Sequence, residues 1–358
     1  MKRVPMETLQ RFSLEALHTA GVHQDVAQAV AEGLVQTSLR GVDSHGLRLL
    51  AHYLRAVKGG RVNPDPTYRF RRTAPSTGLL DADHTFGHAA GMAAVRHAMA
   101  LAREAGTGHV AIYNSSHFGA AAYFALEIAN HDMIGMSFTS TESLIMSTGS
   151  VRPYLGNNPV CMAAPVEGEE PFCLDMATSI LSFNKIRQLR EEGVAAPPGV
   201  GADARGNDTT DPHRITMLQP TGGYKGYGLS MMVEILCSLL TGMPYGRHVT
   251  KMFEVPLSEK RFLGHFVSAF RIDCFQEPRL FKTRLAAMLQ ELRAEPRRNP
   301  KVPVMVPGDP EKREAQRRLR RGIPLSPVEY AMLRDIGREY HVRTSLTAGR
   351  TAALSARR

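Results

Sequence analysis

The sequence predicts an α/β protein in which the two ends of the chain together form a helical domain. Apolar residues recur at every third or fourth position from Met6 to about Arg40, as they do on one face of a helix. In the centre, short β-like runs alternate with Ala-rich helical stretches, and helical periodicity returns after residue 277. A chain of 358 residues, 43% of them hydrophobic, is long enough to bury such a core.

The N-terminal pattern predicts two helices separated near Gly21 and a third helix over residues 43–57, whose first turn holds His45. After the Gly59-Gly60 and Pro64-Asp65-Pro66 breaks, the composition becomes that of an α/β domain. We therefore expect a helical domain of residues 1–66 plus 278–342, an α/β domain of residues 67–277, and a flexible tail of residues 343–358.

The later elements follow from local composition and periodicity. Strands are expected over residues 108–113, 134–139 and 266–272. Helices are expected over residues 88–104, 119–131, 183–192, 226–240, 278–293, 309–321 and 326–338, with a Pro- and Gly-rich loop after the third of them.

The positive charge of the chain is concentrated at its C-terminal end. The formal net charge is +10, and residues 281–358 hold all of this excess, with 18 Lys and Arg against 8 Asp and Glu. The densest part, residues 312–321, is expected to be a solvated helical face, because it lacks the aromatic residues that stack on bases. A nucleic-acid-binding protein is therefore the weaker alternative, and no nucleic-acid partner is expected.

Composition also bounds the compartment and the kind of site. No apolar run approaches 18 residues and the N-terminus has no signal-peptide core, so we expect a cytoplasmic protein without a membrane partner. The fourteen histidines show no HExxH pattern, and none is interpreted as a pair at ligand spacing, so no metal site is expected. The four cysteines lack paired or ligand spacing and are expected to be buried free thiols: Cys161, Cys173, Cys237 and Cys274.

Two histidines lie in loops bracketed by glycine and serine, namely Asp43-Ser44-His45-Gly46 and Ser115-Ser116-His117-Phe118-Gly119. Histidine titrates near neutral pH, so a histidine on such a turn can exchange a proton with a bound substrate. A single histidine is more often structural, and these two loops by themselves leave both interpretations open.

Two glycine-rich segments are candidates for binding a phosphate. Residues 199–204 match the spacing G-x-G-x-x-A, but no strand precedes them and no helix follows, so they are not a Rossmann fingerprint. The segment Gly223-x-x-Gly226-x-Gly228 opens the helix expected over residues 226–240, whose free N–H groups and dipole favour a phosphate, and Lys225 adds charge. A plain N-terminal turn is the alternative.

Taken with the two histidine loops, four further blocks resemble one enzyme family: Leu155-Gly156-Asn157-Asn158-Pro159, Leu174-Asp175-Met176-Ala177-Thr178-Ser179, Gly223-Tyr224-Lys225-Gly226-Tyr227-Gly228-Leu229 and Pro307-Gly308-Asp309-Pro310. They resemble the malate/L-lactate/L-sulfolactate dehydrogenase family of nicotinamide-dependent oxidoreductases, which also contains ureidoglycolate dehydrogenase, diketogulonate reductase and piperideine-carboxylate reductase. The resemblance runs in order from about Leu34 to Arg338. It implies that the α/β domain binds the cofactor and has a mixed sheet and a non-Rossmann fold.

The resemblance also assigns roles to individual residues. His117 matches the proton acceptor of the ureidoglycolate dehydrogenases, and His45 is the second candidate for the acid/base or a group that orients the substrate. Asp43 either holds the tautomer of His45 or caps a helix. Asp175 and Asp309 suit cofactor contacts or helix N-caps, and these roles stay open. Ser44 and Arg48 are the expected substrate-binding residues, and NAD or NADP is expected to contact Thr141, Asp175, Met176, Ala177, Lys225, Gly226, Gly308 and Asp309.

The chain departs from its relatives near the first histidine. Many members carry an arginine four residues after it, suited to gripping a substrate carboxylate, whereas this chain has Leu49 there and Arg48 one position earlier. One helical position turns a side chain by about 100°. Glu142, close to the expected nicotinamide end, would also disfavour a substrate with two negative charges.

These observations predict a dehydrogenase that transfers a hydride between NAD(P) and a small 2-hydroxy acid/2-oxo acid pair. Oxidation of ureidoglycolate and reduction of a cyclic imine carboxylate stay alternatives, because each needs the same hydride and one proton. The resemblance further implies a cofactor cleft near a subunit contact, so a homodimer or larger homo-oligomer is expected. The Met- and Leu-rich segment 226–243 suits either that interface or a core.

Overall fold

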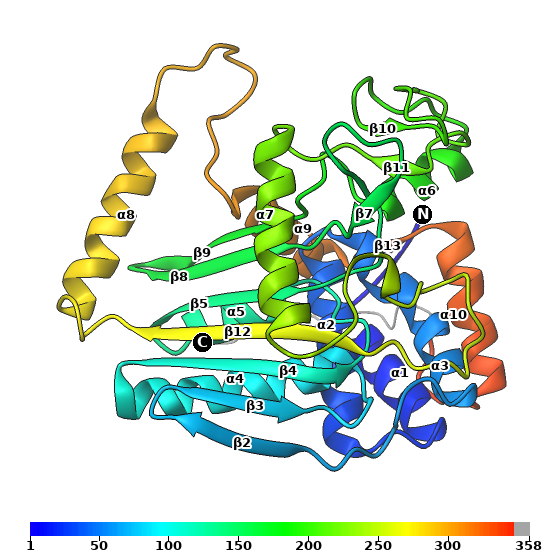
Figure 1. Cartoon of the computed structure of the whole chain (residues 1–358), viewed down its shortest axis with the longest axis horizontal. Coiled ribbons are helices and arrows are strands. Elements are labelled where there is room, and N and C mark those ends of the chain that lie inside the picture. The colour runs from blue at the N-terminus through cyan, green and yellow to red at the C-terminus, as the bar shows by residue number, and fades with distance from the viewer. Residues whose placement is uncertain (347–358) are drawn as a thin grey trace, which may run out of the picture.

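The structure, a computed structural model, describes residues 1–346 and is built around a seven-stranded sheet (Figure 1). The neighbouring strands β3 and β4 are parallel and every other neighbouring pair is antiparallel, so the sheet is mixed, as expected. In spatial order the strands are β2 (Arg69–Ala74), β3 (Thr77–Asp81), β4 (Thr107–Ser115), β12 (Leu263–Arg271), β5 (Met133–Thr139), β8 (Val160–Val166) and β9 (Glu169–Met176).

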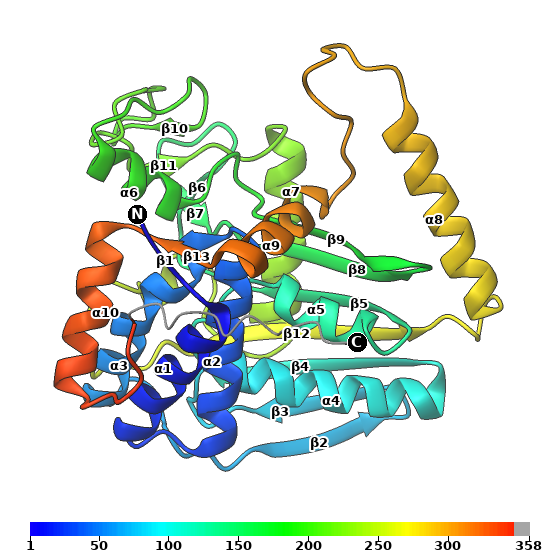
Figure 2. The ribbon, with the colours of Figure 1, turned by 180° about the vertical axis from the view of Figure 1, so that it is seen from behind.

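Helices cover both faces of this sheet (Figures 1 and 2). Helices α4 (Gly87–Ala105) and α5 (Ala122–Ala129) lie on one face, and α7 (Tyr224–Glu234), continued by a π-helical turn over Ile235–Leu239, lies on the other. The alanines of α4 let it lie almost in contact with the sheet, since a side chain at Gly108 would come within 2.0 Å of the Ala98 carbonyl oxygen. The expected Ala-rich helices on an α/β core are confirmed.

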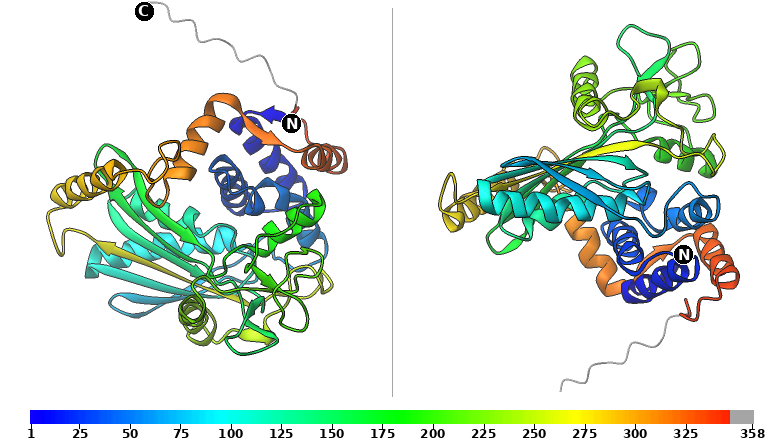
Figure 3. Two further views of the ribbon diagram at one scale, coloured as in Figure 1. Left: turned by 90° about the horizontal axis from the view of Figure 1, so that it is seen from above. Right: turned by 60° about the horizontal axis from the view of Figure 1, so that its bottom comes forward.

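The two chain ends meet in a helical layer beside the sheet (Figure 3). The two end strands, β1 (Lys2–Val4) and β13 (Ile323–Leu325), pair with each other. Apolar side chains from the two ends, among them Leu9, Val30, Leu54 and Leu333, share one fully buried core. The helices of this layer are α1 (Met6–Thr19), α2 (Gln24–Leu39), α3 (Leu50–Lys58), α9 (Asp309–Arg321) and α10 (Pro327–Glu339).

Helix α8 (Pro278–Ala294) lies apart from that layer, on the side of the molecule where β8 and β9 form the edge of the sheet (Figure 1). Its buried Leu289 packs with Val166 of β8. Residues 278–294 therefore lie outside the layer of terminal helices, contrary to the expectation from sequence. The domain boundaries at residues 66 and 277 stay a prediction.

A small four-stranded sheet with helix α6 (Phe183–Glu192) lies above one end of the large sheet (Figure 1). Its strands, in spatial order, are β10 (Gly201–Ala202), β11 (Met217–Leu218), β6 (Ile145–Met146) and β7 (Pro153–Leu155). The G-x-G-x-x-A segment therefore contains a two-residue strand, and no helix follows it. Its rejection as a Rossmann fingerprint is confirmed.

The structure differs from the sequence-based expectation at a helix start, at one cysteine and at the beginning of the tail. The helix expected over residues 43–57 begins only at Leu50; before it, Gly46 separates two 3₁₀ turns, Asp43–His45 and Leu47–Leu49. Cys274 is exposed, while the other three cysteines are buried. The start of the expected tail is tied down, because the amides of residues 343 and 344 donate hydrogen bonds to Glu15, at 2.8 and 3.0 Å, and Leu346 is buried. Residues 347–358 of that tail lie outside the described residues.

The basic helix α9 is not simply a solvated face. Lys312 and Arg318 are buried, 7% and 6% exposed, and form ion pairs with Glu169 and Asp43. Part of the positive excess is therefore neutralised inside the protein. In residues 1–346, no helix is long and apolar enough to cross a membrane, and no cluster of histidine, cysteine or acidic side chains suits a metal ion.

Candidate active site

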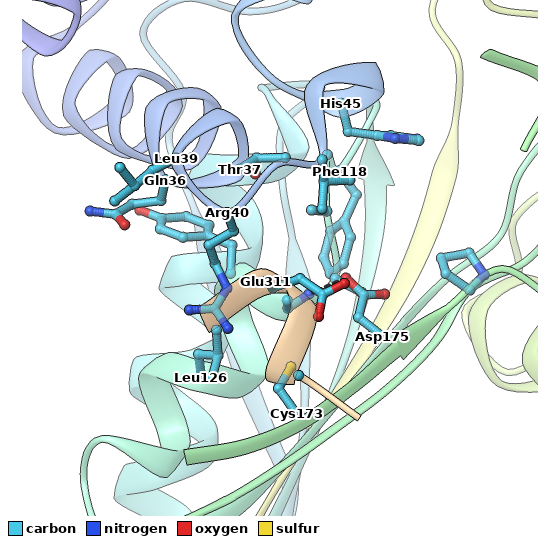
Figure 4. Close-up of a pocket in the computed structure, with 18 of the residues that line it drawn as sticks. Gln36, Thr37, Leu39, Arg40, His45, Phe118, Leu126, Cys173, Asp175 and Glu311 are labelled. Carbon is cyan, nitrogen blue, oxygen red and sulfur yellow. Dashed lines mark hydrogen bonds between the residues drawn. The ribbon is translucent and has the colours of Figure 1, made fainter. Parts of the chain in front are cut away.

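A cavity of about 1190 Å³ lies between the helical layer and the sheet. It is lined from both sides, by α2, α5 and α9, by β9 and by the two histidine loops (Figure 4). A volume of this size is enough for a dinucleotide together with a small acid. The expected site residues that line it are Ser44, His45, His117, Thr141, Asp175, Ala177 and Gly308.

His117 follows the end of β4, and its loop is held by close contacts. Gly119 has φ +79°, and a Cβ there would come within 2.3 Å of the His88 ring. The Tyr53 hydroxyl lies 2.6 Å from Nδ1 of His117, so Nε2 is the ring nitrogen left for a ligand in the cavity. Gly119 thus allows the tight turn of the loop, and Tyr53 of α3 fixes the orientation of the His117 ring.

His45 is held by the 3₁₀ turn that contains it. The Ser44 hydroxyl lies 2.9 Å from Nδ1 of His45, and Gly46 packs so closely on α2 that a Cβ would come within 2.0 Å of the Ser38 hydroxyl oxygen. Asp43 neither orients His45 nor caps the turn, because both of its carboxylate oxygens accept hydrogen bonds from Arg318 at 2.6 and 2.9 Å. Both sequence-based roles for Asp43 were wrong.

The two imidazole rings form one unit at the end of the cavity. Their centroids are 5.9 Å apart and the ring planes differ by 16°. Burial, with a smaller contribution from the charge of Arg48, lowers the pKa of His45 to about 4. Burial lowers the pKa of His117 well below its usual value, and His45 and Arg261 add to this effect. Both rings are therefore neutral at pH 7.

Two more histidines lie behind this pair, and sequence analysis singled out neither. His265 is fully buried between the hydroxyls of Thr139 and Ser115, at 2.7 and 2.8 Å, and burial lowers its pKa to about 3. His88 is also fully buried, packs edge-on against Tyr53, and has its pKa lowered to about 3 by burial. These neutral rings support the position of His117 and Tyr53 from within the core.

Another part of the cavity holds two neighbouring carboxylates, Asp175 and Glu311 (Figure 4). Asp175 lies in strand β9, so its alternative role as a helix N-cap was wrong. Its carboxylate accepts a hydrogen bond from the Ala122 amide at 2.9 Å, yet enclosure by protein and the nearby charge of Glu311 raise its pKa to about 6. Arg40, which pairs with Glu170 at 3.0 Å, points toward the same region.

Thr141 is positioned by the Gly-Asn-Asn-Pro block. Its amide donates to Oδ1 of Asn158 at 2.8 Å, and its hydroxyl donates to Oδ1 of Asn157 at 2.9 Å. Gly156 leaves the room for this arrangement, since a Cβ there would come within 2.1 Å of the Thr141 hydroxyl. The block thus holds Thr141 at the cavity wall.

The remaining expected site residues do not line the cavity: Arg48, Met176, Lys225, Gly226 and Asp309. Arg48 faces Glu191 at 3.6 Å. Lys225 is exposed at the N-terminus of α7. Asp309 is the first residue of α9, not its cap, and its carboxylate accepts hydrogen bonds from Arg293 at 2.9 and 2.7 Å. The cofactor contacts expected of these residues stay predictions.

Sequence analysis also missed Tyr53 and Arg261. Tyr53 contacts His117 from 64 positions away, and no local pattern marks that contact. Arg261 precedes β12 in a basic stretch that looks like a solvent-exposed loop, yet it is 2% exposed and lines the cavity. The only available signal was its place directly before a strand rich in β-forming residues.

Comparison with known proteins places the chain in a family. A family model of malate/L-lactate dehydrogenases matches residues 4–334. The chain belongs to the malate/L-lactate dehydrogenase family. The expected dehydrogenase class is thereby confirmed, and the family implies a nicotinamide cofactor.

Relatives match over most of the chain. A malate dehydrogenase of Pyrococcus abyssi (strain GE5 / Orsay) is 34% identical over 351 residues, 95% of this chain and 96% of that protein. The ureidoglycolate dehydrogenase (NAD(+)) of Escherichia coli (strain K12) is 33% identical over 292 residues, 82% and 83% of the two chains. The crystal structure of malate dehydrogenase from Entamoeba histolytica superposes with a TM-score of 0.91 at 28% identity, covering 95% of this chain and 98% of that one.

Proposed function

We propose that this dehydrogenase interconverts a small 2-hydroxy acid and the corresponding 2-oxo acid, with His117 as the acid/base. The observation that carries the proposal is the stacked His45–His117 pair at one end of a cavity whose remainder has room for a dinucleotide. Oxidation of a hydroxy acid releases one proton from the hydroxyl group and one hydride from the same carbon. The site needs one base at that carbon, and His117 supplies it.

The residues present fit a nicotinamide dinucleotide. Gly308 has φ +92°, and a Cβ at this position would lie only 3.1 Å from the carbonyl oxygen of Cys173, so a bulkier residue would narrow the cavity there. Asp175 offers hydrogen bonds to ribose or amide groups, and Thr141 and Ala177 complete the wall. When bound, NAD(P) accepts or supplies the hydride.

The protonation states of the two histidines suit His117 as the base and His45 as the group that binds the substrate oxygen. A neutral His117 whose Nδ1–H is directed at the Tyr53 oxygen has its lone pair on Nε2, ready to take the hydroxyl proton. A carboxylate substrate bound beside the ring adds negative charge, which raises the pKa of His117 toward neutrality. Ser44 holds the His45 ring through Nδ1, which leaves its Nε2 for the substrate oxygen.

We also propose a cytoplasmic enzyme that is a homodimer or larger. The helix that begins with Tyr224 exposes a series of large apolar side chains, which supports its use as a subunit interface. They are Tyr224, Leu229, Met231, Met232, Ile235, Leu239 and Leu240, each between 39% and 69% exposed. The buried free thiols suit a reducing compartment.

The test is a screen of purified protein with NADH and NADPH against a panel of 2-oxo acids and cyclic imine acids. His117→Ala should lower kcat by about 10²–10⁴-fold while cofactor binding, followed by nicotinamide fluorescence, is retained. An unchanged kcat in this variant would make His117 structural and would transfer the role to His45.

A further inference from the structure

Arg48, the arginine expected to bind the substrate carboxylate, does not line the cavity. Leu49, where the resemblance leads one to expect an arginine, is 6% exposed within the core of the helical layer. Arg48 is turned toward Glu191 of α6, 3.6 Å away, and does not line the cavity. A 2-hydroxy acid carries a carboxylate at every step of the reaction, so its charge needs another partner.

Arg261 is placed to be that partner. It is 2% exposed, lines the cavity, and lies close enough to His117 for its charge to lower the pKa of that ring. Nε and Nη2 donate to the carbonyl oxygen of Thr250 at 3.0 and 2.8 Å, and Nη2 also donates to Glu142 at 2.5 Å. Nη1 donates a hydrogen bond to no group within residues 1–346. It is not a fully buried atom either, so it remains accessible. Its two N–H groups are therefore available to a ligand in the cavity.

The backbone next to Arg261 has an unusual conformation, which helps to fix the direction of the Arg261 side chain. Phe262 has φ +51°, a conformation that a bulky residue rarely adopts, and its ring packs edge-on against His84. The pairing of β12 with β4 shifts register between Leu263 and His265. This turn sends the side chains of Arg261 and Phe262 in different directions. Strain of this kind persists where the surrounding structure enforces it, and it is common at binding sites.

The charges around the cavity restrict what Arg261 can bind. Among the described residues, Arg40 and Arg261 are the only lysine or arginine side chains that line it, and Arg40 pairs with Glu170 and points away from His45 (Figure 4). Arg261 is already paired with Glu142, so the two together carry no net charge. One substrate carboxylate can use Nη1, but a second would find no further cation and would be repelled by Glu142.

We propose that Nη1 of Arg261 binds the carboxylate of the substrate in place of the displaced Arg48, and that Glu142 confines the site to acids with a single negative charge. This inference rests on the proposed function, since it names the substrate class of the same site. It predicts a preference for monocarboxylic 2-oxo acids over dicarboxylic ones.

The first experiment replaces the guanidinium. Arg261→Gln should raise KM for the best monocarboxylic 2-oxo acid by roughly tenfold or more, the loss expected for a charge-assisted hydrogen bond, and leave KM for the cofactor unchanged. Added guanidinium ion, at concentrations well below those that denature, should restore part of the rate in Arg261→Ala. The matched control is Arg61→Gln: Arg61 is equally buried, but all three of its guanidinium nitrogens donate to backbone carbonyls, so its loss should lower Tm without guanidinium rescue.

Removing Arg261 leaves the partly buried Glu142 without its ion-pair partner, which threatens folding. The double variant Arg261→Gln/Glu142→Gln removes both charges and should fold while keeping the raised KM for the acid. An unchanged KM for the acid in the double variant, or equal losses for acid and cofactor without guanidinium rescue, would overturn the role of Arg261.

The second experiment tests the charge limit with pyruvate and oxaloacetate as probes. The wild-type enzyme should have the higher kcat/KM with pyruvate, and Glu142→Gln should raise the oxaloacetate-to-pyruvate ratio of kcat/KM by roughly tenfold, because the repelling charge is gone. A wild-type preference for oxaloacetate would overturn the charge limit. Turnover of no acid at all, by a protein that binds NADH, would refute the proposed function itself.

Discussion

The hydroxyl of Tyr53 is the contact whose removal gives the sharpest test of the catalytic arrangement. Tyr53→Phe removes one oxygen atom, which lies 2.6 Å from Nδ1 of His117. The aromatic ring stays, so its packing against Phe86 and His88 is retained. The change therefore acts on the hydrogen bond and leaves the core volume almost unaltered.

The size of the effect follows from that single bond. A neutral hydrogen bond contributes about 0.5–1.5 kcal/mol, and a buried group left without a partner costs about 1–3 kcal/mol. When His117 takes the substrate proton it becomes an imidazolium, and its Nδ1–H then lacks the tyrosine oxygen. A loss of about 1–2 kcal/mol in the transition state corresponds to a kcat lower by roughly 5- to 30-fold.

Initial rates of NAD(P)H formation across pH measure this effect. Because the imidazolium is destabilised, the pKa of His117 should fall further, and the acidic limb of the kcat/KM profile should move to lower pH by about one unit. Tyr227→Phe is the control, since it removes a hydroxyl that bonds Ser147 at 3.2 Å, away from the cavity. A kcat within twofold of wild type and an unmoved acidic limb in Tyr53→Phe would refute the role of Tyr53.

The cofactor site, the acid stability and the assembly of the enzyme can each be tested in solution. Lys225→Ala should raise KM for the cofactor more than KM for the acid, as expected when a contact to non-reacting atoms is lost; an unchanged cofactor KM would move the phosphate site away from α7. Acid should destabilise the fold, because burial lowers the pKa values of His45, His88 and His265 to about 4, 3 and 3 while the unfolded chain takes up these protons near pH 6.5. Asp175, with its pKa raised to about 6, works in the opposite direction but is one group against three, so the urea midpoint should fall between pH 6.5 and pH 4; a constant midpoint would contradict the burial of these rings. Sedimentation of active enzyme should show a homodimer or larger, and a monomer with full specific activity at nanomolar concentration would exclude the assembly requirement.

The sequence by itself determined the order and type of most elements and the identity of the acid/base candidates. Apolar periodicity placed α1 and α2 on either side of Gly21, and the Ala-rich stretches placed α4 and α5. Turn chemistry marked the two histidine loops, because Gly46 and Gly119 are needed where the chain packs too closely for a side chain. These are local properties, readable from neighbours a few positions apart.

Only the tertiary structure decided which side chains meet in the site. The contacts Tyr53–His117, Glu142–Arg261 and Asp43–Arg318 join residues 64, 119 and 275 positions apart. Each depends on how separate helices and strands pack, and a periodic pattern carries no information about that packing. The same reason accounts for the errors at Asp43 and Asp175, because a carboxylate beside an apolar run suits a helix cap. In the structure Asp43 instead pairs with the distant Arg318, and Asp175 lies within strand β9.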